Sequence, residues 1–397
     1  MKSTIKEKIQ SLIMESRIKQ EIPVPDDIRA IKDVFVKNGH KLYIVGGAVR
    51  DALLGKTPKD YDLATDALPE KVEAMMNQSG FKTLPTGKAF GIINVFTQTD
   101  EYEVATFRKD VGSGRRPDSV EFTDIESDVN RRDLTINALF YDIDAGEIVD
   151  LVGGVHDLKN GIVRTVGSAE DRFGEDRLRI LRAIRFAGRF GSDLDPSVDA
   201  ALKKDARLRG LPTHDEFGVE TTDNISPERI RDEFIKGLKT TKSVKHFMQL
   251  LTRYKLWDYI FEGVENINVQ PIEEKDPVVL ISWVLANNDP TKLSKDLNKL
   301  TYTIAEVRAI TFLVALLKFN PTKIVTVKKL LLLSGLSDDQ VKRFTDLVGL
   351  DTKLIDALLK FQLTVTGQDA MNAGITKGQE IGQFINQKEI ENFKTLL

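Results

Sequence analysis

The chain has no cysteine and few histidines, which restricts the chemistry that its side chains offer. Without cysteine among its 397 residues, disulfides, thiolate metal sites and a cysteine nucleophile are excluded. The spacing of the four histidines does not match that of metal ligands, so a histidine-built metal site is not expected. They are His40, His156, His214 and His246.

Long apolar runs are also missing. The most apolar stretch, 278–286, is far shorter than a membrane span. Residues 1–20 alternate charged with apolar residues, which predicts an amphipathic helix and not a signal peptide. We therefore expect a cytoplasmic protein that has no membrane partner.

No excess of positive charge is present, because 57 basic residues face 60 acidic ones and the net charge is −3. Contact with a nucleic acid would thus need a local basic patch. Residues 291–330 carry eight basic residues against Asp296 and Glu306, either as a phosphate-binding surface or as ordinary solvated helix faces. The basic residues are Lys292, Lys295, Lys299, Arg308, Lys318, Lys323, Lys328 and Lys329.

The order of the periodic segments predicts an α+β fold, with a mixed sheet first and helices after it. Residues 1–38 predict helices, the second of which begins at Asp26–Asp27 and stops at Gly39. Strands are predicted at 41–45, 59–64, 92–96, 101–107 and 139–143, and a helix at 48–54. After about residue 165 we expect a helix at 175–190, a loop or linker at 203–225, and helices from Ser226-Pro227-Glu228 onward.

Asp60 and Asp62 are the first candidate active groups. Alternation along the predicted strand would put both carboxylates on one face. Mg²⁺ prefers oxygen ligands and is usually bound by one or two carboxylates together with substrate phosphates. The pair therefore suits a Mg²⁺–triphosphate site, although an isolated Asp-x-Asp is more often a solvated surface pair.

Gly46 and Gly47 stand between a predicted strand and a predicted helix. Backbone N–H groups at such a helix start can bind an anion, and glycine allows phosphates to come close. Arg50 follows within the first turn and would add positive charge. A simple tight turn is the commoner use of a glycine pair.

Together, 46–51 (GGAVRD) and 59–65 (KDYDLAT) resemble the signature of the DNA polymerase β-like nucleotidyltransferase superfamily. The residues of these two motifs are similar to those of class II tRNA nucleotidyltransferases and bacterial poly(A) polymerases. Four later segments look like further motifs of this family, in the family's order. They are 131–139 (RRDLTINAL), 150–161, 175–179 (EDRLR) and 226–233.

The resemblance implies a nucleotidyltransferase head at 1–150, a neck at 151–225 that recognises the base, a helical body at 226–300 and a tRNA-binding tail at 301–397. Asp60 and Asp62 would hold two Mg²⁺ ions, with Glu103 as a candidate third carboxylate or a solvated strand residue. Further residues would bind the nucleotide, on motif positions or, for Arg182 and Arg185, from family expectation together with helix geometry. They are Gly46, Gly47, Arg50, Arg131, Arg132, Asp133, Asn137, Asp176, Arg179, Arg182 and Arg185.

Asp176 and Arg179 are expected to select the base. If they lie three apart on one helix, the carboxylate accepts from the amino group of cytosine or adenine while the guanidinium donates to the neighbouring ring nitrogen. Uracil and guanine present the reverse order and would leave polar groups mismatched. The alternative is an ordinary salt bridge within the helix.

The implied reaction is attack by the tRNA 3′-hydroxyl on the α-phosphate of CTP or ATP, with release of pyrophosphate. Residues 108–120 predict a mobile loop, whose family counterpart helps to switch from CTP to ATP. A poly(A) polymerase, an enzyme that adds only CC or only A, and a non-catalytic RNA-binding relative are the alternatives. The sequence implies no protein partner.

Overall fold

The computed structural model describes residues 16–111, 119–209, 213–214, 220–221 and 225–397. The chain divides into two compact units, Met1–Asn224 and Ile225–Leu397. The finer division into head, neck, body and tail stays a prediction. No helix in the described ranges is long and apolar enough to cross a bilayer.

The first unit is built on an eight-stranded mixed sheet with the order β1-β10-β9-β2-β3-β6-β5-β4. Only β3 and β6 pair in parallel; every other neighbouring pair is antiparallel. The strands are β1 (Arg17–Lys19), β2 (Leu42–Val45), β3 (Asp62–Thr65), β4 (Lys82–Gly87), β5 (Ile92–Phe96), β6 (Glu101–Thr106), β9 (Phe140–Asp142) and β10 (Glu147–Val149). Two small antiparallel pairs accompany this sheet: β7 (Arg108–Val111) with β8 (Ser119–Phe122), and β11 (Thr213–His214) with β12 (Glu220–Thr221).

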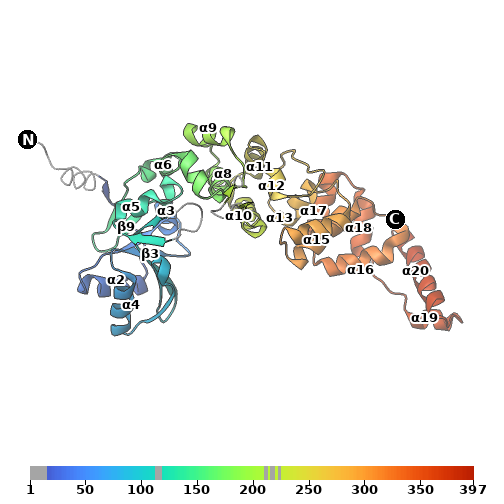
Figure 1. Ribbon diagram of the computed structural model, residues 1–397. Helices are drawn as coiled ribbons and strands as arrows, with labels where there is room; N and C mark the ends of the chain where they lie inside the picture. The colour runs from blue at the N-terminus through green and yellow to red at the C-terminus, as the bar shows by residue number, and fades with distance from the viewer. Residues whose placement is uncertain (1–15, 112–118, 210–212, 215–219, 222–224) are drawn as a thin grey trace, which may run out of the picture. The chain divides into compact units, whose positions relative to one another are not determined.

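Helices cover the sheet, and α2 and α4 pack against each other and against its strands (Figure 1). α2 begins at Asp26 and ends just before Gly39, whose φ of +76° stops the helix, as predicted. The helices of this unit are α2 (Asp26–Lys37), α3 (Gly47–Leu53), α4 (Pro69–Gln78), α5 (Ile125–Asn130), α6 (Gly154–Asn160), α7 (Ala169–Glu175), α8 (Leu178–Phe190) and α9 (Pro196–Lys204), with 3-10 turns η1 (Lys88–Phe90) and η2 (Thr135–Asn137).

The core below the candidate site is aromatic. Tyr43 on β2, Phe107 after β6 and Phe140 on β9 lie within 5.6–6.2 Å of one another, centroid to centroid. All four residues of β2 are buried, which fits an apolar strand in the middle of a covered sheet. This packing stabilises the strand ends from which the site is built.

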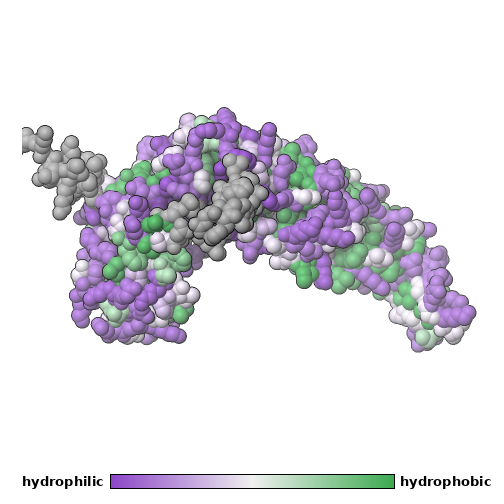
Figure 2. Space-filling model, in the orientation of Figure 1, coloured by the Kyte–Doolittle hydropathy of each residue, from purple (hydrophilic) through white to green (hydrophobic). Residues whose placement is uncertain are grey.

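The second unit, 225–397, is entirely helical. α10 begins at Pro227 after Ser226, as predicted, and Gly237 lets its backbone pack directly on the Phe247 ring. Leu330, Leu332 and Leu333 of α16 are exposed, and Figure 2 shows apolar surface over this part of the unit. The helices are α10 (Pro227–Thr240), α11 (Val244–Arg253), α12 (Trp257–Ile260), α13 (Pro277–Val284), α14 (Pro290–Lys299), α15 (Ile304–Leu316), α16 (Ile324–Ser334), α17 (Asp338–Val348), α18 (Thr352–Lys360), α19 (Gly367–Asn372) and α20 (Gly378–Lys394), with the 3-10 turn η3 (Pro321–Lys323).

Several predicted elements are corrected. Residues 17–19 form β1 and not the end of a helix, because they pair with β10; residues 1–15 lie outside the described part of the chain. The predicted loop at 108–120 begins and ends with the paired strands β7 and β8. The predicted strand at 59–64 begins only at Asp62, and the region predicted as a linker, 203–225, contains β11 and β12.

Candidate active site

A glycine turn joins β2 to α3. Gly46 has a φ of +67°, a conformation that side chains other than glycine rarely adopt, and its N–H donates to Leu139 O at 2.9 Å. A Cβ at this position would lie 3.4 Å from Nη1 of Arg132. The turn therefore brings an arginine side chain up to bare backbone at the start of α3.

The two candidate metal ligands lie at and just before the start of β3, a central strand of the sheet, and both are exposed. Only Asp62 belongs to β3, opposite Val45, so the predicted strand does not extend to Asp60, and strand alternation does not fix its direction. They nevertheless interact. The pKa of Asp62 is raised because surrounding protein displaces water from its carboxylate and because Asp60 repels the ionised form, while Arg132 acts in the opposite direction.

Glu103 lies on β6, next to β3. The parallel register pairs Leu63 with Val104, so Glu103 occupies the row beside Asp62. The side chain is exposed, and no cluster of three His, Asp or Glu side chains that could hold a metal occurs among the described residues. Its role as a third carboxylate stays a prediction.

Arg131 and Arg132 are both bound to Asp128, a buried carboxylate on α5 that the sequence analysis did not identify. Arg131 Nε donates to Asp128 Oδ1 at 2.8 Å. Arg132 donates to Asp128 Oδ2 from Nε at 3.3 Å and from Nη2 at 3.0 Å, and its guanidinium lies 4.6 Å from the Phe140 ring centroid. The sequence signal that could have identified Asp128 is its spacing, since it stands three positions before Arg131 and four before Arg132.

Arg50, Asn137 and Asp133 form one buried hydrogen-bonded chain. Arg50 donates to the amide oxygen of Asn137, and Asn137 Nδ2 donates to Asp133 Oδ1 at 3.1 Å. Arg50 is only 7% exposed and lies against the Phe186 ring; burial, together with nearby arginines, lowers its pKa although Asp51 acts the other way. The predicted contact between Arg50 and phosphates stays a prediction.

Asp133 ends this chain at the helix α8. Burial by itself raises the pKa of Asp133, but Arg182, Asn137 and the Leu134 N–H stabilise the ionised form and lower the pKa overall. Arg182 Nε lies 2.6 Å from Asp133 Oδ2. The carboxylate thus links the η2 region to α8.

Asp176 and Arg179 do not share a helix face, contrary to the prediction. α7 ends at Glu175, Asp176 is extended with φ −148° and ψ 108°, and α8 begins at Leu178. The helix breaks because the Asp176 carboxylate accepts the Leu178 N–H at 3.0 Å, while Arg179 pairs with Glu175 and donates to Arg131 O at 3.0 Å. Base selection by Asp176 and Arg179 stays a prediction.

The arginines of α8 face the sheet domain. Arg182 and Arg189, seven residues apart and thus about two turns, bind Asp133 and Asp51 respectively, the latter at 2.8 Å. Arg185 is buried and lies 4.3 Å from the Phe186 ring centroid. Arg182 and Arg189 therefore hold α8 against the η2 region and α3.

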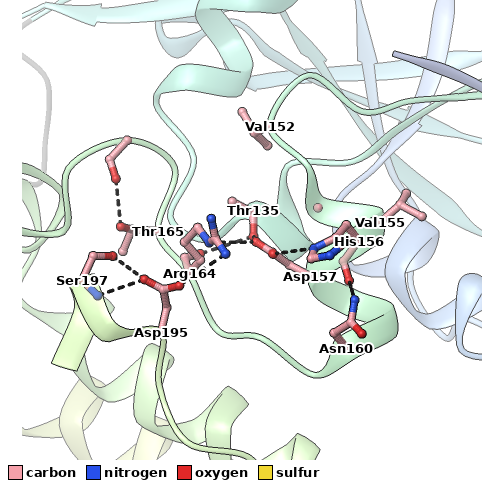
Figure 3. A network of polar contacts seen from close by, with 12 residues as sticks. Thr135, Val152, Val155, His156, Asp157, Asn160, Arg164, Thr165, Asp195 and Ser197 are labelled. Carbon is pink, nitrogen blue, oxygen red and sulfur yellow. Dashed lines mark hydrogen bonds and ion pairs between the residues drawn. The ribbon is translucent and has the colours of Figure 1, made fainter. Parts of the chain in front are cut away.

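A second polar network, shown in Figure 3, fastens the segment 150–161 below the site. Asp150 caps α6 by accepting N–H groups of Gly154 at 2.8 Å and Val155 at 2.9 Å. Asp157 accepts the Thr135 hydroxyl at 2.7 Å and pairs with Arg164 at 3.4 Å. Gly154 packs so closely on Thr135 that a Cβ would overlap the Thr135 carbonyl.

The basic region 291–330 is heterogeneous. Lys328 is buried and donates to Leu358 O at 3.1 Å and Leu359 O at 2.9 Å, near the end of α18. It therefore caps a helix and is neither a phosphate ligand nor a solvated lysine. Lys292 forms an exposed ion pair with Glu265 at 2.7 Å.

The aspartates, the arginine-lined glycine turn and every strand of the mixed sheet except β1 lie in a part of the chain that matches a known family. Residues 42–164 match the poly A polymerase head domain, and residues 219–267 match the probable RNA and SrmB-binding site of polymerase A. The chain belongs to the family of class II tRNA nucleotidyltransferases (CCA-adding enzymes) and bacterial poly(A) polymerases.

Relatives within the family differ in how much of their length is matched. The human mitochondrial CCA tRNA nucleotidyltransferase 1 is 33% identical over 91% of this chain and 85% of its own. The Bacillus subtilis CCA-adding enzyme is 39% identical over 57% of this chain, which spans only about half, 53%, of that relative.

Solved structures share the fold. The Bacillus stearothermophilus CCA-adding enzyme in complex with CTP has a TM-score of 0.63 and 27% identity, covering 92% of this chain and 91% of that one. The Thermotoga maritima CCA-adding enzyme complexed with tRNA has a TM-score of 0.64 at 19% identity, covering 97% and 94%.

Proposed function

We propose that the protein is a CCA-adding tRNA nucleotidyltransferase, which adds C, C and A from CTP and ATP to the tRNA 3′ end without a template and releases pyrophosphate. The family membership supports this assignment, and the named relatives are CCA-adding enzymes. tRNA and the two nucleoside triphosphates are thus the proposed partners, and a cytoplasmic location stays a prediction.

One observation at the site carries the proposal. Asp62 interacts electrostatically with both Asp60 and Arg132, and Arg132 lies against the Gly46 turn. Carboxylates that can bind a cation and a guanidinium that can bind an anion are therefore neighbours at the start of β3. A nucleoside triphosphate with its metal ions carries both kinds of charge and matches this arrangement.

The donor set fits Mg²⁺. Asp60 disfavours the ionised form of Asp62, a cost that a bound divalent cation would offset, and both side chains offer oxygen ligands. Asp60 and Asp62 would hold two ions. Bound Mg²⁺ would activate the attacking hydroxyl and neutralise charge on the triphosphate.

The chain's own residues position the substrates. Gly46 and Gly47 leave the backbone open to phosphates, and Arg132 supplies positive charge beside them. Asp133 and Asp51 hold Arg182 and Arg189, so α8 stays in place beside α3. We assign base recognition to the start of α8, where Asp176 and Arg179 lie.

Product analysis tests this function. A tRNA that ends before the CCA sequence is incubated with Mg²⁺ and CTP, ATP or both, and the 3′ ends are sequenced. We expect two C residues with CTP alone and CCA with both nucleotides. Long A tails with ATP alone would instead identify a poly(A) polymerase, and extension that stops after CC or needs a CC end would identify a partial enzyme.

A further inference from the structure

We propose that Asp128 is a positioning residue that holds Arg131 and Arg132 as one unit for the triphosphate of the incoming nucleotide. The inference rests on the proposed function, and it assigns a role to a side chain that itself need not touch the substrate. Asp128 is 2% exposed, whereas the two arginine side chains above it are 24% and 18% exposed.

The geometry divides the carboxylate between the two arginines. Oδ1 receives the Nε–H of Arg131, and Oδ2 receives two N–H groups of Arg132. Arg132 is also fixed by the Phe140 ring and by the Asn137 carbonyl, 3.4 Å from Nη1. With so many contacts its guanidinium is held in one orientation.

The position of Arg132 connects this arrangement to the site. Its Nη1 lies beside the Gly46 turn, 3.4 Å from where a Cβ on that glycine would stand. Arg132 thus stands beside the proposed phosphate turn, which directly follows Val45, the strand partner of Asp62. An anion that binds there meets a guanidinium already oriented by Asp128.

Charge balance explains why a carboxylate is required. Two adjacent guanidinium groups repel each other, and repulsion is strongest where water is excluded. The single charge of Asp128 compensates one of them and leaves a net positive charge at the opening. A neutral side chain at 128 would allow the arginines to separate and would give up three charge-assisted hydrogen bonds.

The experiment compares nucleotide binding in Asp128→Asn with binding in the wild-type protein. We expect CTP affinity to fall about 10- to 100-fold, the range found when a buried partner that orients a ligand-binding group is removed. The loss for CMP should be much smaller, because CMP lacks the β- and γ-phosphates. Calorimetric titration of CTP and CMP without RNA measures both.

Asp142→Asn is the matched control. Asp142 is also 2% exposed and also binds two cationic side chains, Arg17 and Lys41, in the same unit. The Asp142→Asn variant should lose thermal stability, as Asp128→Asn does, but should bind CTP with unchanged affinity. Equal losses of CTP affinity in the two variants would overturn the inference.

Asp128→Glu keeps the negative charge and is the second test variant, to be used if Asp128→Asn does not fold. Its longer side chain displaces both arginines, so CTP affinity should again fall more than CMP affinity. Unchanged CTP affinity in either folded variant, or equal loss for CTP and CMP, would contradict the positioning role. Absence of tRNA extension by the wild-type protein would instead reject the proposed function, because the binding titrations do not depend on transfer.

Discussion

At the scale of single residues, the neighbouring carboxylates of Asp60 and Asp62 cost the folded protein stability in the absence of a bound cation. The raised pKa of Asp62 means that its ionised form is destabilised in the fold. Substitution by asparagine should therefore leave stability unchanged or higher, as is common when functional charge clusters are removed.

Activity should respond in the opposite direction. Asp60→Asn and Asp62→Asn are each expected to lower kcat at least about a thousandfold, because both proposed Mg²⁺ ligands are needed. Single-turnover extension of tRNA measures the rate, and a thermal melt of the same samples checks the fold. Rapid extension by either variant would contradict the metal-binding role.

Asp133 gives a prediction about pH. Its pKa is lowered in the folded protein, so its ion pair with Arg182 contributes full stability above the unfolded pKa of about 3.9 and loses it as pH falls through the folded value. Asp133→Asn should cost about 3 kcal/mol at pH 7, because it leaves Arg182 without its carboxylate.

Urea unfolding of the wild-type protein and of Asp133→Asn between pH 7 and pH 3 measures the difference in their unfolding free energies. This difference should stay constant down to about pH 4 and shrink at lower pH, where the wild-type Asp133 carboxylate takes up a proton. A difference that grew on acidification would contradict the assigned ion pair.

At the scale of elements, the contact between α6 and η2 depends on a glycine. Gly154→Ala would put a methyl group into the Thr135 carbonyl, so the backbone must move and the network of Asp157 and Thr135 with it. We expect a loss of about 2–3 kcal/mol in unfolding free energy.

Gly174→Ala is the control for this substitution. Gly174 lies in α7 and a Cβ there meets nothing within 4 Å, so alanine should be neutral or slightly stabilising. Thermal melts of both variants suffice. Equal melting temperatures for the two would contradict the packing argument.

Local patterns predicted some elements well and others poorly, for physical reasons. α2, β5 and the start of α10 carry their own stop, alternation or cap signals, and the structure confirms them. β1 has three residues and depends on β10, more than 120 residues further along, so no local pattern marks it. The break at Asp176 arises from side-chain capping, which helical periodicity does not report.

The same holds for the candidate site. The glycine turn and the aspartates have recognisable spacing, and Asp128 had a local signal in its distance from Arg131 and Arg132. Asp51 and the docking of α8, in contrast, depend on contacts formed only in the folded unit. Arg182, which the resemblance assigns to the nucleotide, pairs with Asp133 within the protein.

At the scale of the whole molecule, every proposed nucleotide ligand lies in the first unit, Met1–Asn224. CTP should therefore slow hydrogen exchange in the sheet and in α8 and leave exchange in 225–397 nearly unchanged. At a hundred times its Kd, CTP should raise the free energy of opening by up to about 2.7 kcal/mol. Mass spectrometry of exchanged peptides measures this, with UTP as the control. Equal protection of both units would contradict the assignment.

Lys328 offers an intrinsic reporter of the integrity of the second unit. Its amine is enclosed and bound to two carbonyls, whereas Lys329, next to it, is exposed. A water-soluble acylating reagent should label Lys329 quickly and Lys328 only after α16 and α18 separate. The labelling ratio of these adjacent lysines would reveal unfolding of the second unit around α16 and α18, without any engineered probe.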